Sequence, residues 1–473
     1  MASYRLKLSD GTTTLDLYSA TDYTVMEGGL SMPPPPLKTS YIYNPFKDGG
    51  NLASARYENR TIEIALKLSD TTLANLKTNI RAIQRLLNDA KERTLLGHGS
   101  QVYLEYQWGD TANQSTFFDV LHGDLILPRD YLKVGLTKFH IMPAILQLVC
   151  KPFGRYTNQT VAQATLENED YSTNHNYMDI TTAEAYGDAP ARMYIKAVNA
   201  SGTAANRKMW VAKRSGSRYD DDLWLQGEDS TSTTDVEGNT TYTDTSDATC
   251  SGSYRLHVVN NTGTPIAADT VIGRMNYSIA TPPEGLFRVL IYSKTYCFAG
   301  DAEIDHVCWG VGWSYGSKTY TPSEANGDYY YQSAHSTWET LDLGLLRIPP
   351  IPKSDIAGTN AFELRIYQYI ADSTNNTSPY VQWDLDYIFL LPIDEGCVIV
   401  NSVGQTDEIA IDGITDPPNV FKISSAKVTD YPDYVGAPFT LGRENTRIYM
   451  LREDVKGATF TVDITYQPQF LVI

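Results

Sequence analysis

The sequence predicts a mainly β fold with one amphipathic helix near the N-terminus. Residues 69–93 carry leucine and isoleucine at spacings of three and four, which places these side chains on one face of a helix. The flanking segments Arg60–Leu68 and Val102–Tyr106 alternate apolar and polar side chains, as strands do. Beyond residue 156, short alternating segments recur between turn-forming residues, which favours antiparallel sheets.

The helix is expected over Thr71–Arg93. Its predicted buried face consists of Leu73, Leu76, Ile80, Ile83 and Leu87. The side-chain oxygen of Asp70 or Thr71 can cap its start by accepting an amide of the first turn. A helix laid across a small sheet therefore predicts a sheet-plus-helix domain, of split-barrel type, over residues 1–156.

A chain of 473 residues exceeds one ordinary core, so two or three domains are expected. Within the first domain, the four prolines of Met32–Leu37 exclude a central strand and predict a loop or an arm. Residues 160–393 read as an antiparallel β-sandwich, jelly-roll-like, in which Gly227–Gly252 is expected to be an exposed loop. Residues 394–473 are again strand-rich and are expected to pack with the rest.

The composition excludes several classes of function. A net charge of −18 argues against neutralising the phosphates of nucleic acid and against docking on an anionic membrane. The sequence has no apolar run of about 20 residues, so no transmembrane helix is expected, and its N-terminus lacks the apolar core of a signal peptide. The five cysteines form no Cys-x-x-Cys pair and are expected to be reduced, with a Cys297–Cys308 bridge as the alternative.

No sequence motif indicates an active site. The chain has no phosphate-binding glycine loop, no Gly-x-Ser-x-Gly and no His-Glu-x-x-His. We therefore expect no catalytic residue, no cofactor and no metal ligand. The carboxylates of Asp301–Asp305 and of Asp384 with Asp386 fit either a calcium site or a solvated face, and we favour the solvated face.

An aromatic cluster is the candidate binding surface. Tyr329, Tyr330, Tyr331 and Trp338 are predicted to contact a carbohydrate or a partner, because flat rings in loops can stack on sugar faces. The alternation in Trp309–Tyr315 is equally typical of a buried strand. Trp313 is therefore expected in the core, and part of Tyr329–Tyr331 at the surface.

The N-terminal region resembles the N-terminal domain of the distal tail proteins of long-tailed bacteriophages. The matching segments are Arg60–Leu68, Thr71–Arg93, Val102–Tyr106, Asp119–Leu125, Ile145–Pro152 and, near the C-terminus, Gly436–Tyr449. The segment Trp338–Asp394 is similar to jelly-roll inserts of phage structural proteins. The middle region is much larger than the compact galectin-like domain usual in this family.

The resemblance implies a structural virion protein, assembled in the host cytoplasm, that forms a ring at the junction of tail tube and tail tip. A hexameric ring is expected, with a trimer as the alternative, and with the tail tube protein and a tip or hub protein as partners. DNA would only pass through the lumen, and an acidic lumen wall would keep the DNA from adhering to it. The alternatives are a carbohydrate-binding adhesion module on the host surface and, less favoured, a glycan-cleaving enzyme.

Overall fold

The structure is a computed structural model, and it describes residues 5–19, 21–43, 50–107, 115–128, 140–156, 159–160, 163–170, 175–181, 187, 189–199, 207–219, 221–230, 232–235, 240–261, 270–297, 307–320, 330–332, 337–352, 355–356, 360–370, 380–415, 418–424, 429–430, 432–453 and 458–471. The chain divides into two compact units. Unit 1 comprises Met1–Gln159, Tyr186–Arg192 and Tyr466–Ile473, and unit 2 comprises Thr160–Ala185 and Met193–Thr465.

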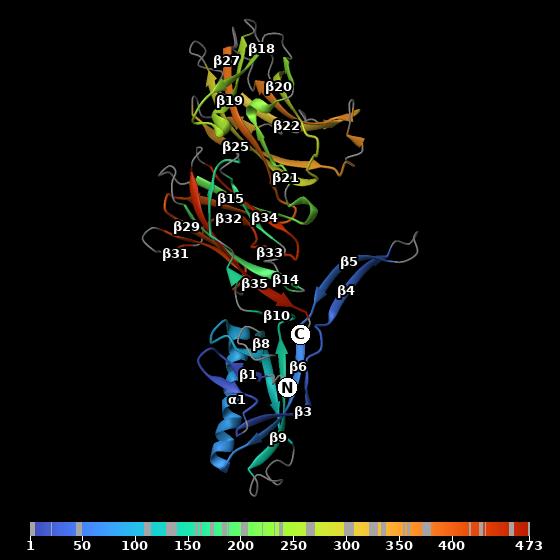
Figure 1. The fold of residues 1–473 in the computed structure, drawn as a ribbon, viewed down its shortest axis with the longest axis vertical. Helices are drawn as coiled ribbons and strands as arrows, with labels where there is room; N and C mark the ends of the chain where they lie inside the picture. The colour runs from blue at the N-terminus through green and yellow to red at the C-terminus, as the bar shows by residue number, and fades with distance from the viewer. Residues whose placement is uncertain are drawn as a thin grey trace. The chain divides into compact units, whose positions relative to one another are not determined.

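Unit 1 consists of antiparallel strands and one long helix (Figure 1). Its elements are β1 (Arg5–Ser9), β2 (Thr14–Asp16), β3 (Tyr23–Ser31), β4 (Leu37–Tyr43), β5 (Gly50–Tyr57), β6 (Arg60–Ser69), α1 (Leu73–Leu96), β7 (Tyr103–Gln107), β8 (Ser115–Ile126), β9 (Ile141–Cys150) and β10 (Gly154–Arg155). The strands pair in the order β2-β1-β7-β8, and the second half of β8 continues into β8-β9-β6-β3. Among the residues that the structure describes, β4 and β5 form a two-stranded sheet of their own.

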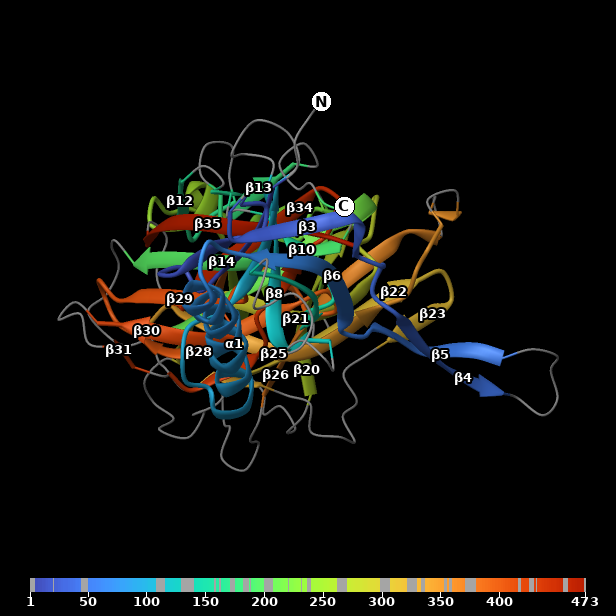
Figure 2. The same cartoon turned by 90° about the horizontal axis from the view of Figure 1, so that it is seen from below.

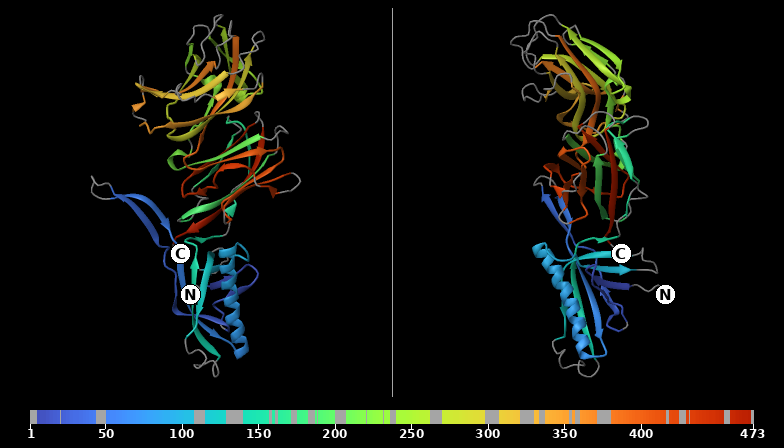
Figure 3. Two further views of the ribbon diagram at one scale, coloured as in Figure 1. Left: turned by 180° about the vertical axis from the view of Figure 1, so that it is seen from behind. Right: turned by 90° about the vertical axis from the view of Figure 1, so that its left-hand side faces the viewer.

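The core of unit 1 lies between these strands and α1, because their alternation turns every second apolar side chain inward. In β6 the inward residues are Ile62, Ile64, Leu66 and Leu68, all fully buried. Figure 3 shows α1 lying along one face of the sheet. Its buried residues are Leu76, Ile83, Leu86, Leu87 and Ala90.

The caps and the buried face of α1 differ in detail from the prediction. The N-cap is Thr72, whose hydroxyl accepts the Asn75 amide at 3.2 Å. The helix ends at Gly97, which adopts the left-handed conformation that glycine tolerates best. Ile80 is only half-buried, because the helix turns it toward the rim of the core.

The first part of unit 2 contains two sheets that combine strands from before and after residues 224–392. Their strands are β12 (Ala164–Glu167), β13 (Tyr177–Ile180), β14 (Ala189–Asn199), β15 (Arg207–Ser215), β28 (Cys397–Val403), β29 (Glu408–Asp412), β30 (Asn419–Ile423), β31 (Thr429–Asp430), β32 (Tyr434–Gly436), β33 (Thr440–Leu441), β34 (Thr446–Arg452) and β35 (Thr459–Phe470), and β11 (Gln159–Thr160) precedes them. One sheet has the order β13-β34-β15-β28-β32, and the other contains β35-β14-β29-β30-β31. Two of these strands, Ala189–Asn199 and Thr459–Phe470, also include residues assigned to unit 1.

The second part of unit 2 is a sandwich of two six-stranded sheets. One sheet contains β16 (Trp224–Gln226), β18 (Thr240–Ser246), β19 (Tyr254–Asn261), β21 (Gly285–Cys297), β25 (Glu339–Ile348) and β27 (Tyr380–Pro392). The other contains β17 (Ser232–Asp235), β20 (Thr270–Ser278), β22 (Val307–Tyr315), β23 (Lys318–Tyr320), β24 (Tyr330–Gln332) and β26 (Phe362–Ile370). Apolar side chains from both sheets form one shared core.

The sandwich is inserted between two neighbouring strands of one sheet, since β15 and β28 pair with each other although the whole sandwich separates them in sequence. The predicted mainly β fold, with one N-terminal helix and a β-sandwich, is confirmed. The predicted division of the chain into domains 1–156, 160–393 and 394–473 remains a prediction, because the two compact units do not test it.

The expectation that Gly227–Gly252 forms an exposed loop is wrong. Its described part contains the 3-10 turn Gly227–Asp229 and strands β17 and β18, and Gly227 is buried. A β-carbon on Gly227 would lie 2.1 Å from the carbonyl oxygen of Leu385. The polar composition of this segment gave no indication that its backbone packs so closely against a neighbouring strand.

Candidate functional site

The hairpin β4–β5 is the most exposed regular element of unit 1, and Figure 2 shows it projecting from the other strands of that unit. Every side chain of the hairpin that the structure describes is exposed. Leu37, Tyr41 and Tyr57 have exposed fractions of 53%, 50% and 39%. Such a ribbon gains little from burial within its own chain.

The two faces of the hairpin differ in chemistry. The pairs Leu37↔Tyr57 and Thr39↔Ala55 place their side chains on one face, which is apolar. The pairs Lys38↔Arg56 and Ser40↔Ser54 occupy the opposite, polar face, where the two serine hydroxyls are 2.6 Å apart. An amphipathic ribbon with an uncovered apolar face is typical of an element that docks on another surface.

A second exposed apolar feature crosses the sheet β8-β9-β6-β3. Ile126 pairs with Ile145, and Ile145 pairs with Ala65. Met26 lies in the bulge of β3 between Val25 and Leu30, which pair with Leu66 and Ile64 on either side of Ala65. The exposed fractions of Ile126, Ile145 and Met26 are 49%, 45% and 46%. These residues form an apolar row on the face of the sheet that points away from the core.

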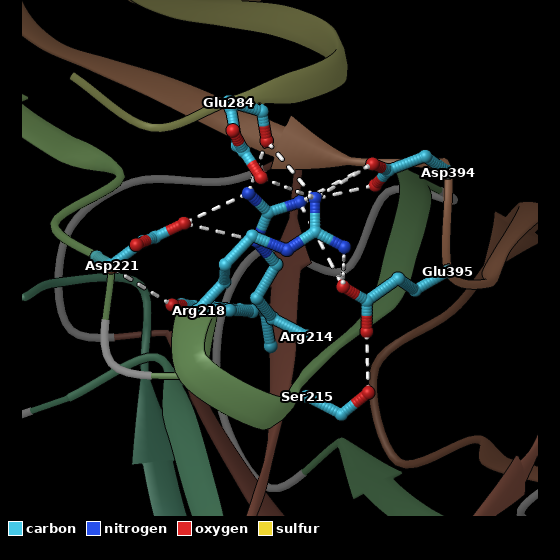
Figure 4. Close-up of polar contacts among 8 residues, drawn as sticks. Arg214, Ser215, Arg218, Asp221, Glu284, Asp394 and Glu395 are labelled. Carbon is cyan, nitrogen blue, oxygen red and sulfur yellow. Dashed lines mark hydrogen bonds and ion pairs between the residues drawn. The ribbon is translucent and has the colours of Figure 1, made fainter. Parts of the chain in front are cut away.

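Unit 2 contains a buried charge network around Arg214, at the end of β15 (Figure 4). The Arg214 side chain is fully buried. Its guanidinium donates to Asp221 at 2.8 Å and to Asp394 at 3.1 Å, and it also donates to the carbonyl oxygen of Glu284. It therefore joins the residues just before the sandwich to those just after it.

Arg218 and Ser215 extend this network. Arg218 donates to Glu395 at 2.5 Å, and the Ser215 hydroxyl donates to the same carboxylate at 2.5 Å. Gly285 adopts a φ of +135°, and a β-carbon there would lie 2.5 Å from a carboxylate oxygen of Asp394. Arg214 is fully buried at the centre of the network, whereas Arg218 and Asp394 are partly exposed at its rim. A buried guanidinium that several partners hold suits a structural clamp.

The structure contradicts the expectation that Asp384 and Asp386 lie on a solvated face, because both are fully buried. Asp384 accepts from Arg255 at 2.6 Å and lies 2.6 Å from Nδ1 of His257. Asp386 accepts the backbone amide of Ser251 at 2.8 Å. Side chains of a neighbouring strand and a backbone amide in a tight turn stabilise the two carboxylates. The local sequence pattern around Asp384 and Asp386 does not reveal these partners. Among the described residues, no group of three or more acidic, histidine or cysteine side chains is arranged to hold a metal ion.

The predicted aromatic contacts lie in different environments. Trp338 is half-buried and stacks on Tyr292, with ring centroids 5.1 Å apart. Tyr329 lies outside the described residues; Tyr330 and Tyr331 belong to β24, but the description does not extend to their side chains. Their role as contacts stays a prediction.

Trp313, expected in the core, is half-buried. It packs against the sandwich core and donates from Nε1 to the carbonyl oxygen of Arg347 at 3.1 Å. Trp309 is fully buried, as the buried-strand interpretation requires. Tyr320, which belongs to the same aromatic cluster of the sequence, is 44% exposed and stacks beside Trp313.

Charge is divided unequally between the units. Unit 1 carries 18 Lys and Arg against 16 Asp and Glu, whereas unit 2 carries 20 against 40. Crowded carboxylates perturb each other in unit 2. Burial, followed by the charges of Asp229 and Asp244, raises the pKa of Glu228 to about 7. Cys150 and Cys397 are free thiols, and the Cys297–Cys308 pairing remains a prediction.

The Arg214 network predicts a large loss of stability in Arg214→Met. The change removes the buried cation beside Asp221 and leaves Arg218 as the cation beside Asp394 and Glu395, which should lower the free energy of unfolding by about 3–5 kcal/mol. Thermal and urea unfolding of the intact chain measure this. Lys196→Met, which removes a half-exposed partner of Glu408, is the control and should cost about 1 kcal/mol or less. Equal losses in the two variants would contradict a clamp.

The raised pKa of Glu228 predicts a specific pH dependence. The folded state holds the Glu228 proton more tightly than the unfolded chain, so this carboxyl lowers stability as pH rises from about 4.5 to about 7. Glu228→Gln should therefore raise the melting temperature at pH 8 and leave it unchanged near pH 4.5. Glu92→Gln, on the exposed face of α1, is the control and should show no such difference. A Glu228→Gln effect that is the same at both pH values would be inconsistent with this explanation.

The structure was compared with known proteins. No family model matches the chain, and no curated protein matches its sequence. SPP1 Dit, described as a paradigm of the hub adsorption apparatus in phages that infect Gram-positive bacteria, matches with a TM-score of 0.29 and 13% identity, over 46% of this chain and 71% of that chain. A chain of the phage P2 baseplate in its activated conformation with calcium matches with a TM-score of 0.25 and 10% identity, over 77% of this chain and 98% of that chain.

The CBM22-1 xylan-binding domain of Paenibacillus barcinonensis Xyn10C matches with a TM-score of 0.20 and 15% identity, over 36% of this chain and 94% of that chain. These matches concern the fold, and no residue's role is carried over from them. Within the described ranges, no helix has the length and hydropathy to cross a bilayer. The structure is thus similar to phage distal tail and baseplate proteins, the similarity that the sequence led us to expect.

Proposed function

We propose that this chain is a structural protein of a bacteriophage tail that forms a closed ring at the junction of tail tube and tail tip. The ring is hexameric, with a trimer as the alternative. It leaves an axial passage for DNA and offers a surface to the tube protein on one side and to a tip or hub protein on the other. The protein belongs to the virion tail and is assembled in the host cytoplasm. No enzymatic activity, cofactor or metal is part of the proposal.

The observation that carries the proposal is the uncovered hairpin β4–β5. A two-stranded ribbon is at best marginally stable in water unless it packs on something else. Its apolar pairs remain exposed within the single chain, so a partner surface is needed to cover them. An element that projects from one place and docks at another makes a heterologous contact, which closes into a ring or grows into a filament.

The charge distribution bears on the passage for DNA. Unit 1, which resembles the ring-forming domain, carries nearly equal numbers of acidic and basic residues. The acidic composition of the whole chain therefore gives no support to an acidic wall built from unit 1. The proposed conduit depends on ring closure alone.

The purified chain is expected to form a ring of six copies, or of three, when its mass is measured by light scattering and its symmetry by negative-stain imaging. Assembly should be reversible by dilution, since it depends on a surface contact. A chain that stays monomeric at every concentration and also occurs in isolated particles at a copy number unrelated to three or six would contradict the proposal.

A second candidate function is carbohydrate binding by the sandwich. The observation that favours it is Tyr320, which lies at the sheet edge beside β22, pairs with Trp313 and is 44% exposed. Tyrosine rings at an exposed sheet edge can stack on the apolar face of a sugar. In this proposal Tyr329, Tyr330, Tyr331 and Trp338 supply further contacts to a host-surface glycan.

Tyr320→Ala and Tyr330→Ala are expected to weaken binding of the intact chain to host wall polysaccharide without changing its melting temperature. Trp338→Ala should lower the melting temperature, because it removes the ring that stacks on Tyr292. Co-sedimentation and thermal melts on the same samples measure both. No binding by the unmodified chain would refute the adhesion function, and release of new reducing ends would instead indicate a glycan-cleaving enzyme.

A further inference from the structure

We propose that the apolar face of hairpin β4–β5 in one copy docks on the apolar row of unit 1 in the next copy. The hairpin face consists of Leu37, Thr39, Tyr41, Ala55 and Tyr57, and the sheet row consists of Met26, Ala65, Ile126 and Ile145. This inference rests on the proposed function and assigns the surfaces by which the ring would close.

The two surfaces match in size. The row crosses four neighbouring strands, which at about 4.8 Å between strands gives a length of about 14 Å. On β4, Leu37, Thr39 and Tyr41 share one face, and the four residue-to-residue steps from Leu37 to Tyr41 span about 13 Å at about 3.3 Å per step. A hairpin laid across the four strands therefore covers the row from end to end.

Charged side chains lie near both surfaces. The hairpin carries Lys38 and Arg56, both exposed, and Lys38 has an ion pair with Glu58 at 3.5 Å just outside it. The sheet face carries Glu63 and Asp124, each two residues along its strand from a member of the row. Gln147 donates to Glu63 at 2.9 Å and holds that carboxylate beside the row. Lys38 and Arg56 lie on the polar face of the hairpin, and Lys67 lies on the same face of the sheet as the row, two residues from Ala65. The match between the two surfaces therefore rests on their apolar side chains and their size.

A second copy of this chain is the occupant that these observations favour. The hairpin and the row are different surfaces of the same unit, so each copy supplies one donor and one acceptor. Burying the row removes three large apolar side chains from water, each about half exposed in the single chain. Because the contact is heterologous, successive copies add in one direction until the ring closes.

The test uses two variants of the intact chain. The donor variant carries Leu37→Asp with Tyr57→Asp, and the acceptor variant carries Ile126→Asp with Ile145→Asp. Each alone should be monomeric, with assembly weakened roughly 100-fold or more, because two charges replace apolar contacts. An equal mixture should form dimers and nothing larger, since only one intact donor can meet one intact acceptor. Ser54→Asp, on the polar face of the hairpin, is the control and should assemble as the unmodified chain does.

Disulfide cross-linking tests the same pair of surfaces without charged substitutions. Thr39→Cys combined with Ile145→Cys should give a ladder of disulfide-linked chains under mild oxidation. Either change alone should give no ladder. Thr39→Cys combined with Thr78→Cys, which lies on the exposed face of α1, should also give none.

The inference is overturned if the mixture stays monomeric, if either Asp variant still forms rings, or if the cysteine ladder fails to form. Rings from the unmodified chain together with any of these results would leave the proposed function standing and reject only this contact. An unmodified chain that never assembles would reject both.

Discussion

The clamp around Arg214 is the interaction on which the arrangement of unit 2 depends. A fully buried guanidinium is costly to desolvate, and this cost is offset only because carboxylates and a carbonyl oxygen surround it. These partners come from three separate parts of the chain: the segment after β15, the start of β21 and the segment after β27. The same residue that terminates one strand thus fixes both ends of the sandwich, and the apolar core between the two six-stranded sheets can form on a defined base.

The two units have different physical characters. In unit 2 some carboxylates pair with basic side chains, as Asp384 does with Arg255, and burial raises the pKa of Glu228 to about 7. Unit 1 is nearly balanced in charge, and two apolar surfaces of it remain uncovered. Exposed apolar surface of this kind is typical of a site at which a protein binds another molecule. The two uncovered apolar surfaces of unit 1 suit association, and unit 2 exposes single large side chains such as Tyr320 and Leu345.

The sequence predicted the elements whose pattern is local. Strand β6 and helix α1 follow from the periodicity of their apolar residues, although the cap at Thr72 and the half-burial of Ile80 depend on how the helix is rotated against the sheet. The proline-rich arm was recognised, but not the hairpin that follows it, because β4 and β5 have no neighbour to impose a strong alternation. The burial of Asp384 and Asp386 and the role of Arg214 could not be predicted, since their partners lie far away in sequence. The positions of Tyr329, Tyr330 and Tyr331 as contacts rest on composition alone.

The pairing of β15 with β28 has a further consequence for how this chain tolerates change. The two strands are hydrogen-bonded neighbours, so the whole sandwich begins and ends at nearly the same point of the sheet. For the surrounding strands, the inserted sandwich has nearly the same effect as a short loop. The entropy cost of closing a loop grows only slowly with the length of the loop. Such a point can accept insertions, deletions or an unrelated module while the flanking register is kept. The sheet thus acts as a stable frame, and the inserted module is the part that natural selection can most readily exchange.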